Sequence, residues 1–202
     1  MSGTTPTGRL DAEGPGSPAQ RERRRRILAA ARDLASAGGF EQMQMRTVAE
    51  RADVALGTLY RYFPSKVHLL VSVLAQEFEV ARQRLSDTPV PGDSAADRVM
   101  HVMTGITGSL QRDPHLTEAL TRAFMFADAS VAEESHVVAR QVIAILTDAM
   151  SARPDPSDRE VAIAKVIADV WLANLVQWVT GRTSAGDVQE SLETAVRLLL
   201  RP

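Results

Sequence analysis

Residues 43–66 read MQMRTVAERADVALGTLYRYFPSK, which is the pattern of two short helices separated by a tight turn. The inner face of the first helix is expected to carry three small apolar residues, Val48, Ala49 and Ala52. In the second helix, Leu59 and Phe63 lie four residues apart and therefore face the same side. Because the inner residues of the first helix are small, the second helix can cross it closely. The segment therefore predicts a helix-turn-helix unit.

The turn between these helices falls at Asp53. Turns of this kind often use Gly because the backbone takes a positive φ there, and Asp is among the few other residues that tolerate it. Val54 follows and is expected to fill the turn. Pro64 should end the second helix, and Ser65 is placed to cap a new helix that starts at Lys66.

The outer face of the second helix carries hydroxyl groups, a cation and aromatic rings. Such groups suit phosphate oxygens and base edges, and Gly57 would let the backbone approach a sugar-phosphate strand closely. We expect Tyr60 and Lys66 to contact phosphate and Thr58 to contact base edges. The candidate DNA-binding residues are Arg24, Arg46, Thr47, Gly57, Thr58, Tyr60, Arg61, Tyr62 and Lys66. An ordinary helical hairpin with exposed tyrosines is the alternative.

Charge is distributed unevenly along the chain. Residues 20–70 carry 10 Lys and Arg against 5 Asp and Glu, whereas the whole chain has a formal net charge of −2, so the remainder is acidic. A basic segment of this kind is the electrostatic footprint of a nucleic-acid contact. Four consecutive arginines, residues 23–26, would oppose the dipole of a helix N-terminus, and a phosphate partner would offset that cost. A solvated charge run is the alternative.

Composition argues against several classes of site. The chain of 202 residues has no cysteine, which excludes disulfides and thiolate metal ligands, and its four histidines are far apart in sequence. No nucleophile with its base, paired carboxylates, phosphate loop or metal cluster is visible, so we expect no enzyme, metal or cofactor. Residues 105–109 (GITGS) do not make a nucleophile elbow, because the serine is misplaced and no strand precedes it. Without a signal peptide or a run of about 18 apolar residues, a soluble cytoplasmic protein with no membrane contact is expected.

With 45% hydrophobic and 4% aromatic residues and no strand pattern, the chain predicts an all-α fold of about nine helices. Residues 1–19 are expected to be a disordered tail, residues 20–66 a three-helix DNA-binding head, and residues 67–202 a ligand-binding and dimerisation body. The first helix should close at Gly38 and Gly39. Later helices are predicted over 65–86, 94–111, 115–126, 129–151, 158–180 and 187–200.

Residues 57–66 (GTLYRYFPSK), followed by Leu69 and Leu70, closely resemble the signature of TetR-family repressors. Longer segments, residues 20–78, 116–123 with 126–130, and 166–175, resemble the KstR-type repressors of sterol catabolism within that family. The resemblance implies a dimer that binds palindromic operator DNA, represses cholesterol-degradation genes and is released by a sterol-derived acyl-CoA thioester. A regulator of efflux or general lipid metabolism would share the fold and differ only in its pocket residues.

The predicted helix at 158–180 is apolar almost all round. One monomer core needs only one apolar stripe, so a second stripe on this helix and the apolar face of the final helix could be buried in a homodimer as a four-helix bundle. The expected interface residues are Val166, Val170, Ala173, Val188, Leu192, Ala195, Val196 and Leu199. A short recognition helix usually needs two half-sites, which also favours a dimer. A single thick core that uses both stripes is the alternative.

Methionine and aromatic residues concentrate in the predicted body. They suit a large, rigid, hydrophobic guest, although simple core filling uses the same residue types. Because bodies of the resembled family enclose a ligand, we expect a ligand pocket here, with Arg98 or Arg122 as candidate cations for a CoA head group. Ligand binding would move the helix at 65–86 and change the spacing of the two heads. The candidate ligand-binding residues are Phe78, Met100, Met103, Phe124, Phe126, Trp171, Asn174, Leu175 and Trp178.

Overall fold

The structure is a computed structural model that describes residues 17–86, 89–151, 153 and 155–201. These residues form nine α-helices and one short 3-10 turn, and no strand occurs among them. The prediction of an all-α fold of about nine helices is therefore confirmed. In chain order the elements are α1 (Pro18–Gln42), α2 (Met45–Arg51), α3 (Leu56–Tyr62), α4 (Lys66–Ser86), α5 (Ala95–Arg112), α6 (Pro114–Met125), η1 (Ala129–Val131), α7 (Ala132–Met150), α8 (Asp158–Val179) and α9 (Ala185–Leu199).

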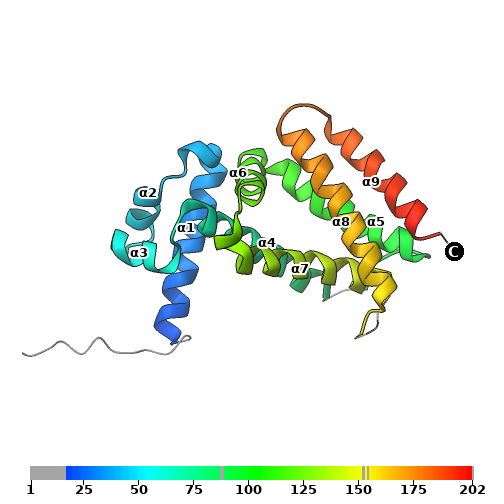
Figure 1. Ribbon diagram of the computed structural model, residues 1–202, viewed down its shortest axis with the longest axis horizontal. Helices are drawn as coiled ribbons and strands as arrows, with labels where there is room; N and C mark the ends of the chain where they lie inside the picture. The colour runs from blue at the N-terminus through cyan, green and yellow to red at the C-terminus, as the bar shows by residue number, and fades with distance from the viewer. Residues whose placement is uncertain (1–16, 87–88, 152, 154, 202) are drawn as a thin grey trace, which may run out of the picture.

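The first three helices form a head at one end of the molecule, drawn in blue and cyan in Figure 1. α2 packs against both α1 and α3, and side chains such as Ile27, Val48 and Leu59 are fully buried at the centre. α1 begins earlier than predicted, because Ser17 Oγ accepts a hydrogen bond from the Gln20 backbone N–H at 3.2 Å and so caps the helix. Of the predicted disordered tail, residues 1–16 lie outside the described residues.

The predicted end of the first helix is a kink in the structure. Gly39 has φ 70° and ψ −168°, which is not helical, and the helical hydrogen bonding then continues to Gln42. The position requires glycine for two reasons. Its φ is positive, and a Cβ placed there would lie 3.0 Å from a carboxylate oxygen of Glu118 on α6. The kink therefore brings the end of α1 close to the body.

α4 connects the head to the body as one continuous helix (Figure 1). Its first turns place Leu69, Leu70 and Val71 in the core, and the helix also packs against α1, α6 and α7. The predicted cap is confirmed, since Ser65 Oγ accepts a hydrogen bond from the backbone N–H of His68 at 3.3 Å. A displacement of the body end of α4 can therefore reach the head through a rigid element.

Capping boxes set the starts of three body helices. In each box a serine side chain accepts from the backbone N–H three residues later, and the acidic residue there accepts from the serine. These hydrogen bonds hold the pKa of each carboxyl below its ordinary value, to about 2 for Glu160. The last helix starts at Ala185 and not at 187 as predicted. Ser184 is its N-cap, and Asp187 is the third helical residue, which completes the capping box. The pairs are Ser94 with Asp97, Ser157 with Glu160, and Ser184 with Asp187.

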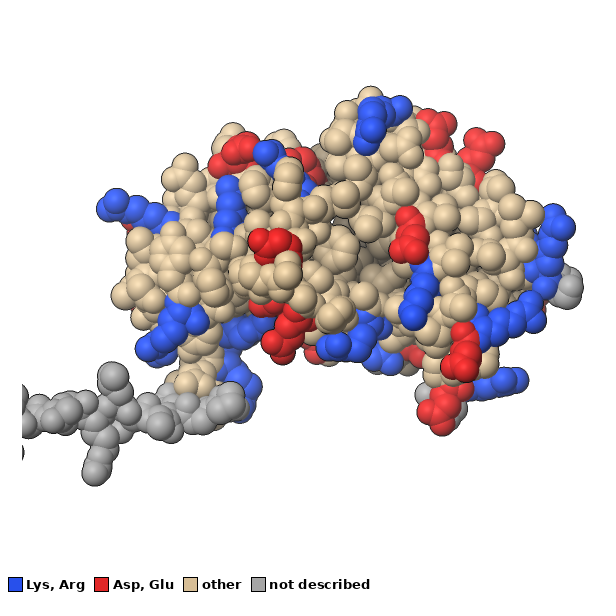
Figure 2. All heavy atoms as spheres, in the orientation of Figure 1, with Lys and Arg blue, Asp and Glu red and all other residues tan. Residues whose placement is uncertain are grey.

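α8 packs between α7 and α9, with Ala164, Ile167, Trp171 and Leu175 buried on its inner side. The molecule is visibly hollowed between α6 and α8 on the face drawn in Figure 2. In the described part of the chain, α8 alone is long and apolar enough to cross a membrane. One such helix is weak evidence for a membrane span, because core helices of soluble proteins pass the same test of length and composition.

Candidate nucleic-acid interface and ligand cavity

The helix-turn-helix has the predicted geometry. Asp53 in the turn has φ 52°, and among the described residues it is the only non-glycine with a positive φ. Leu59 and Phe63 are 0% and 2% exposed, and Val54 packs against the same core. Because packing holds the inner side of α3, its opposite side is left at the surface of the head.

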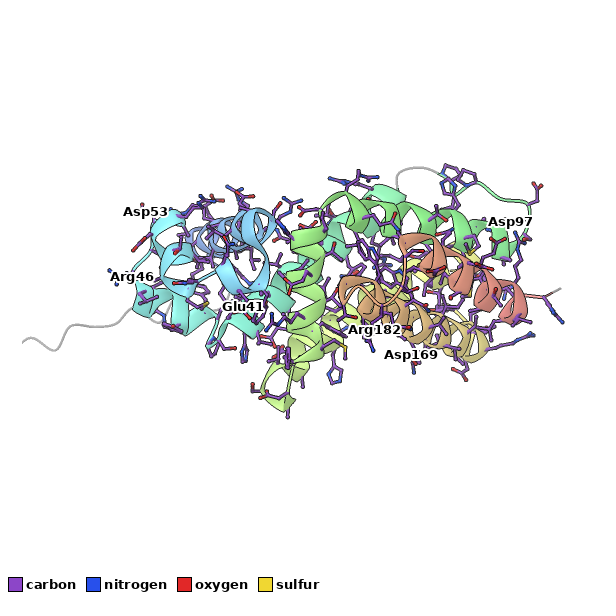
Figure 3. All side chains as sticks on the ribbon, turned by 90° about the horizontal axis from the view of Figure 1, so that it is seen from above. Glu41, Arg46, Asp53, Asp97, Asp169 and Arg182 are labelled. Carbon is purple, nitrogen blue, oxygen red and sulfur yellow. The ribbon has the colours of Figure 1, made fainter. Side chains whose placement is uncertain are left out.

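The surface of α3 and the start of α2 carry most of the predicted DNA-binding residues. Tyr60 is 46% exposed, Gly57 and Arg61 are exposed, and Thr58 and Tyr62 are half-buried. No other part of the protein lies within 4 Å of the position that a Cβ on Gly57 would take, so a DNA strand could approach this backbone. Arg46 and Thr47 of α2 are also exposed. Figure 3 shows Arg46 and Asp53 at the end of the head that points away from the body.

The basic start of α1 lies beside α3. The Arg24 guanidinium is 5.6 Å from the centroid of the Phe63 ring, and Arg26 forms an ion pair of 3.8 Å with Asp53. Arg25 pairs with Glu22 at 2.6 Å, and its hydrogen bond lowers the pKa of Glu22 below the ordinary value. Such exposed pairs add little stability. The start of α1 therefore places basic side chains next to the turn before α3 and the residue that follows it.

Lys66 does not lie with the other candidate DNA-binding residues. Its Nζ is 4.3 Å from the centroid of the Phe40 ring, and the Arg122 guanidinium is 4.6 Å from the same centroid. Partial burial lowers the pKa of Lys66, whereas the nearby charge of Glu41 raises it. An aromatic face attracts an ammonium group, so the side chain turns toward α6. Lys66 therefore belongs to the junction between head and body, and its contact with phosphate stays a prediction.

The head and the body meet mainly where α1 packs on α6. Polar contacts tie the last turns of α1 to α6 and its middle to α4. Figure 3 shows Glu41 on the side of the head next to α6. Arg122, a candidate for the CoA head group, is therefore already engaged with the head. The contacts are Ser36 to Asp113 (2.6 Å), Phe40 N–H to Glu118 (2.9 Å), Arg122 to Glu41 (2.7 Å) and Arg32 to Glu77 (2.7 Å).

The body contains an apolar cavity of about 320 Å³ bounded by α4, α6, α7 and α8, with Leu110 of α5 also in its wall. Four predicted ligand-binding residues line it, namely Phe78, Phe124, Trp171 and Leu175. The rings of Phe78 and Trp171 meet edge to face, with centroids 6.0 Å apart and an interplanar angle of 72°. The Trp171 Nε1–H donates to Thr107 Oγ1 at 3.0 Å, which orients the indole. The structure therefore supplies a preformed aromatic wall, and contact with a ligand stays a prediction.

The other predicted ligand residues do not line this cavity. Met103 is buried in the core, and Met100 borders a shallow depression between α5 and α9. Phe126 is 66% exposed at the end of α6. The Asn174 side chain donates to the Val170 carbonyl of its own helix at 2.8 Å, and Trp178 is half-buried against the core. Apolar composition was therefore a poor guide to which side of each helix faces the cavity.

Sequence reasoning missed all of the wall that α7 provides and, apart from Phe124, the wall that α6 provides. On α7 the missed residues recur every three or four positions, which is a helical stripe that could have been found. Lys165 and Asp169, both exposed, are the charged side chains that border the cavity. Arg98 does not lie there, since its guanidinium donates to the Ala149 and Met150 carbonyls at the end of α7. The other missed wall residues are Leu74, Leu110, Thr117, Leu120, Thr121, Val138, Ala139, Val142, Ile143, Ala168 and Leu172.

Part of the predicted dimer interface lies at the surface of the described chain, on the outer side of α8. Val166 is 46% exposed, Ala173 is exposed and Val170 is half-buried. On α9, Leu198 is 56% exposed and was not predicted. These side chains form an apolar surface on two neighbouring helices, as a helix-bundle dimer requires.

Three predicted interface residues of α9 are core residues instead. Val188, Leu192 and Val196 are 0% exposed, because this side of α9 packs on α8 and α5 of the same chain. A side chain that is fully buried in one chain offers no surface to a second one, so these assignments were wrong. Ala195 and Leu199 are half-buried at the edge of the same side.

Comparison with known proteins identifies the family. Residues 27–73 match the family described as bacterial regulatory proteins, tetR family, and residues 92–199 match the tetracyclin repressor-like C-terminal domain. The chain belongs to the TetR family. It is thus a helix-turn-helix DNA-binding repressor of a non-enzymatic family.

Relatives of this TetR-family repressor match along most of their length. The HTH-type transcriptional repressor KstR of Rhodococcus jostii is 53% identical over 199 residues, which covers 98% of this chain and 92% of the relative. KstR of Mycobacterium tuberculosis is 51% identical over 185 residues, covering 92% and 84%. A solved TetR transcriptional regulator from Rhodococcus sp. RHA1 is 31% identical with a TM-score of 0.83, covering 91% of this chain and 98% of the other.

Proposed function

We propose that this repressor binds palindromic operator DNA as a dimer, represses sterol-catabolism genes in the cytoplasm, and is released by a sterol-derived acyl-CoA thioester. The observation that carries the proposal is the 53% identity with KstR over 98% of the chain. The similarity extends through the body that holds the cavity, and it is not confined to the DNA-binding head. The sterol effector enters the proposal through the resemblance to KstR-type repressors.

The proposed DNA contact uses the exposed side of α3. Tyr60 and Arg61 would meet phosphates, and Thr58 would meet base edges in the major groove. The basic start of α1 beside α3 would add phosphate contacts. Two such heads reach two half-sites about 34–36 Å apart when the dimer axis matches the operator axis.

The proposed dimer pairs the outer side of α8 with the same side of a second copy. Val166, Val170 and Ala173 would meet their symmetry mates, and Leu198 of α9 would extend the contact. The second apolar stripe of α8 is then explained, because the first stripe is already buried against the body.

The proposed effector site is the cavity between α4, α6, α7 and α8. Its 320 Å³ is at the lower end of the usual range of about 300–1,000 Å³ for ligand pockets, and its wall is almost wholly apolar. α6 contributes to the cavity wall on one side and contacts α1 on the other. A ligand that requires a different position of α6 or α4 would therefore shift the head. To change the ratio of the released conformation to the DNA-binding conformation from 1:99 to 99:1, the ligand must bind the released conformation about 10⁴-fold more tightly.

Operator release titrated with three compounds tests this proposal. The compounds are a sterol acyl-CoA, the free sterol acid, and a fatty acyl-CoA of similar size. Each is added to the repressor bound to the DNA that lies upstream of the repressor's own gene. We expect release by the sterol acyl-CoA at much lower concentration than by the other two. Equal release by all three would indicate a general lipid sensor, and release by none would refute the sterol thioester.

A further inference from the structure

Two large apolar side chains of the helix-turn-helix, Leu56 and Tyr60, are exposed, at 40% and 46%. Every other large apolar side chain of residues 43–66 is buried or packs against the core. Leu56 and Tyr60 are four residues apart, so they are neighbours on one side of α3. Gly57 and Arg61 are exposed beside them. The exposed side of α3 therefore carries an apolar pair that does not contribute to the core of the head.

Leu56 is the first residue of α3, and its neighbours in the sequence are also apolar. Ala55 and Gly57 are both exposed, and neither has a side chain that can form a hydrogen bond. Figure 3 shows Asp53, three residues before Leu56, at the end of the head that points away from the body. In helix-turn-helix complexes, residues at the start of the recognition helix reach the base edges in the major groove. Residues 55–57 therefore offer no hydrogen-bonding side chain to the bases there.

Cations on α2 and α3 accompany these apolar residues. Arg61 is on the exposed side of α3, and Figure 3 shows Arg46 of α2 at the outer end of the head. Arg46 pairs with Glu50 at 3.2 Å, but both side chains are largely exposed, so a phosphate can replace Glu50. Contacts with phosphate fix the position of the protein on the duplex and carry no sequence information directly. The bases must therefore be read by other side chains of α3, and Leu56 is placed to do so.

We propose that Leu56 is a specificity-determining residue that recognises the C5-methyl group of a thymine in each operator half-site. This inference rests on the proposed operator binding and adds to it the base that one named residue reads. In the major groove, the thymine methyl is an apolar group among base edges that otherwise present hydrogen-bond donors and acceptors. Leucine can neither donate nor accept a hydrogen bond, so it gains affinity by burying that methyl group. An amino group of cytosine or adenine in the same place would lose water without gaining a partner, which disfavours both bases.

A contact with the DNA backbone is the rival role for Leu56. The deoxyribose is also partly apolar, but it is the same in every nucleotide, so such a contact would carry no base preference. Only thymine recognition depends on the C5-methyl group. Deoxyuridine lacks that methyl group and keeps every hydrogen-bonding group of thymine, so its use in place of thymine separates the two roles.

The test begins with selection of binding sequences from random DNA duplexes by the full-length chain. The wild-type chain should enrich thymine at one position of each half-site. Replacement of that thymine by deoxyuridine should weaken binding about fourfold in one half-site and roughly fifteenfold in both, the changes expected for burial of one and two methyl groups. Leu56→Ala should not enrich thymine there, and it should bind the thymine and deoxyuridine duplexes within about twofold of each other.

Two further variants make the test specific. Leu56→Met keeps a flexible apolar side chain and should keep the sensitivity to deoxyuridine. Met125→Ala is the matched control, since Met125 is 54% exposed as the last residue of α6, and it should behave as the wild type does. Equal binding of the wild-type chain to the thymine and deoxyuridine duplexes, or an undiminished loss in Leu56→Ala, would overturn the thymine assignment alone. Enrichment of no sequence by the wild-type chain would refute the proposed operator binding and the thymine assignment together.

Discussion

Replacing Thr107 by valine is expected to lower the free energy of unfolding by about 1–3 kcal/mol. In the structure the Trp171 Nε1–H donates to Thr107 Oγ1 at 3.0 Å, and the two residues are only 4% and 2% exposed. Valine keeps the shape of threonine but removes the acceptor, so the indole N–H would be left buried and unpaired. In a chain of 202 residues, each kcal/mol corresponds to a lowering of Tm by about 2–4 °C. Because the indole lines the cavity, ligand affinity should fall as well.

Thr147→Val is the matched control, since Thr147 is also buried, at 4% exposure. Its hydroxyl donates at 3.0 Å to the Ile143 carbonyl of its own helix, and that carbonyl keeps its backbone partner when the hydroxyl is removed. The control should therefore cost less than about 1 kcal/mol. Urea unfolding followed by circular dichroism measures both losses, at one protein concentration because the proposed dimerisation would couple to stability. Equal losses in the two variants would refute the argument that the unpaired indole N–H dominates.

Tyr60→Ala should weaken binding to all DNA sequences alike and reduce the log-log salt slope by about 0.9 for each phosphate that the variant no longer binds, whereas Thr58→Ala should alter base preference. Unchanged operator affinity in both variants would remove α3 from the interface. The double variant Val166→Asp with Val170→Asp should sediment as a monomer and release the operator, because burying unpaired carboxylates between two α8 helices is costly; a persistent dimer would place the interface elsewhere. Glu160→Gln should lower the free energy of unfolding above pH 4.5, and the difference from wild type should shrink as the pH falls to about 2, since a hydrogen bond from the serine that caps α8 lowers the pKa of Glu160 from 4.5 to about 2. Acid-unfolding curves that stay equally separated down to pH 2 would contradict this assignment.

Features that depend on neighbours in the chain could be predicted from the sequence alone. The positive φ at Asp53, the cap at Ser65 and the burial of Leu59 and Phe63 follow from residue type or from a spacing of four, and all are found. Helix order and most helix boundaries follow for the same reason, because caps and breaks are local. The family was recognisable in the same local pattern, residues 57–66, and the comparisons confirm it.

Only the tertiary structure decided which apolar side of a helix lies inside and which partner a charged side chain finds. Leu192 has the periodicity expected of an interface residue, yet α9 turns it toward α5 and α8 of the same chain. Lys66 stands beside a DNA-reading motif, yet the Phe40 ring holds its ammonium group at the junction with the body. The cavity wall likewise combines side chains from α4, α5, α6, α7 and α8. Periodicity is a property of one helix, whereas burial and pairing depend on contacts between residues that are far apart in the sequence.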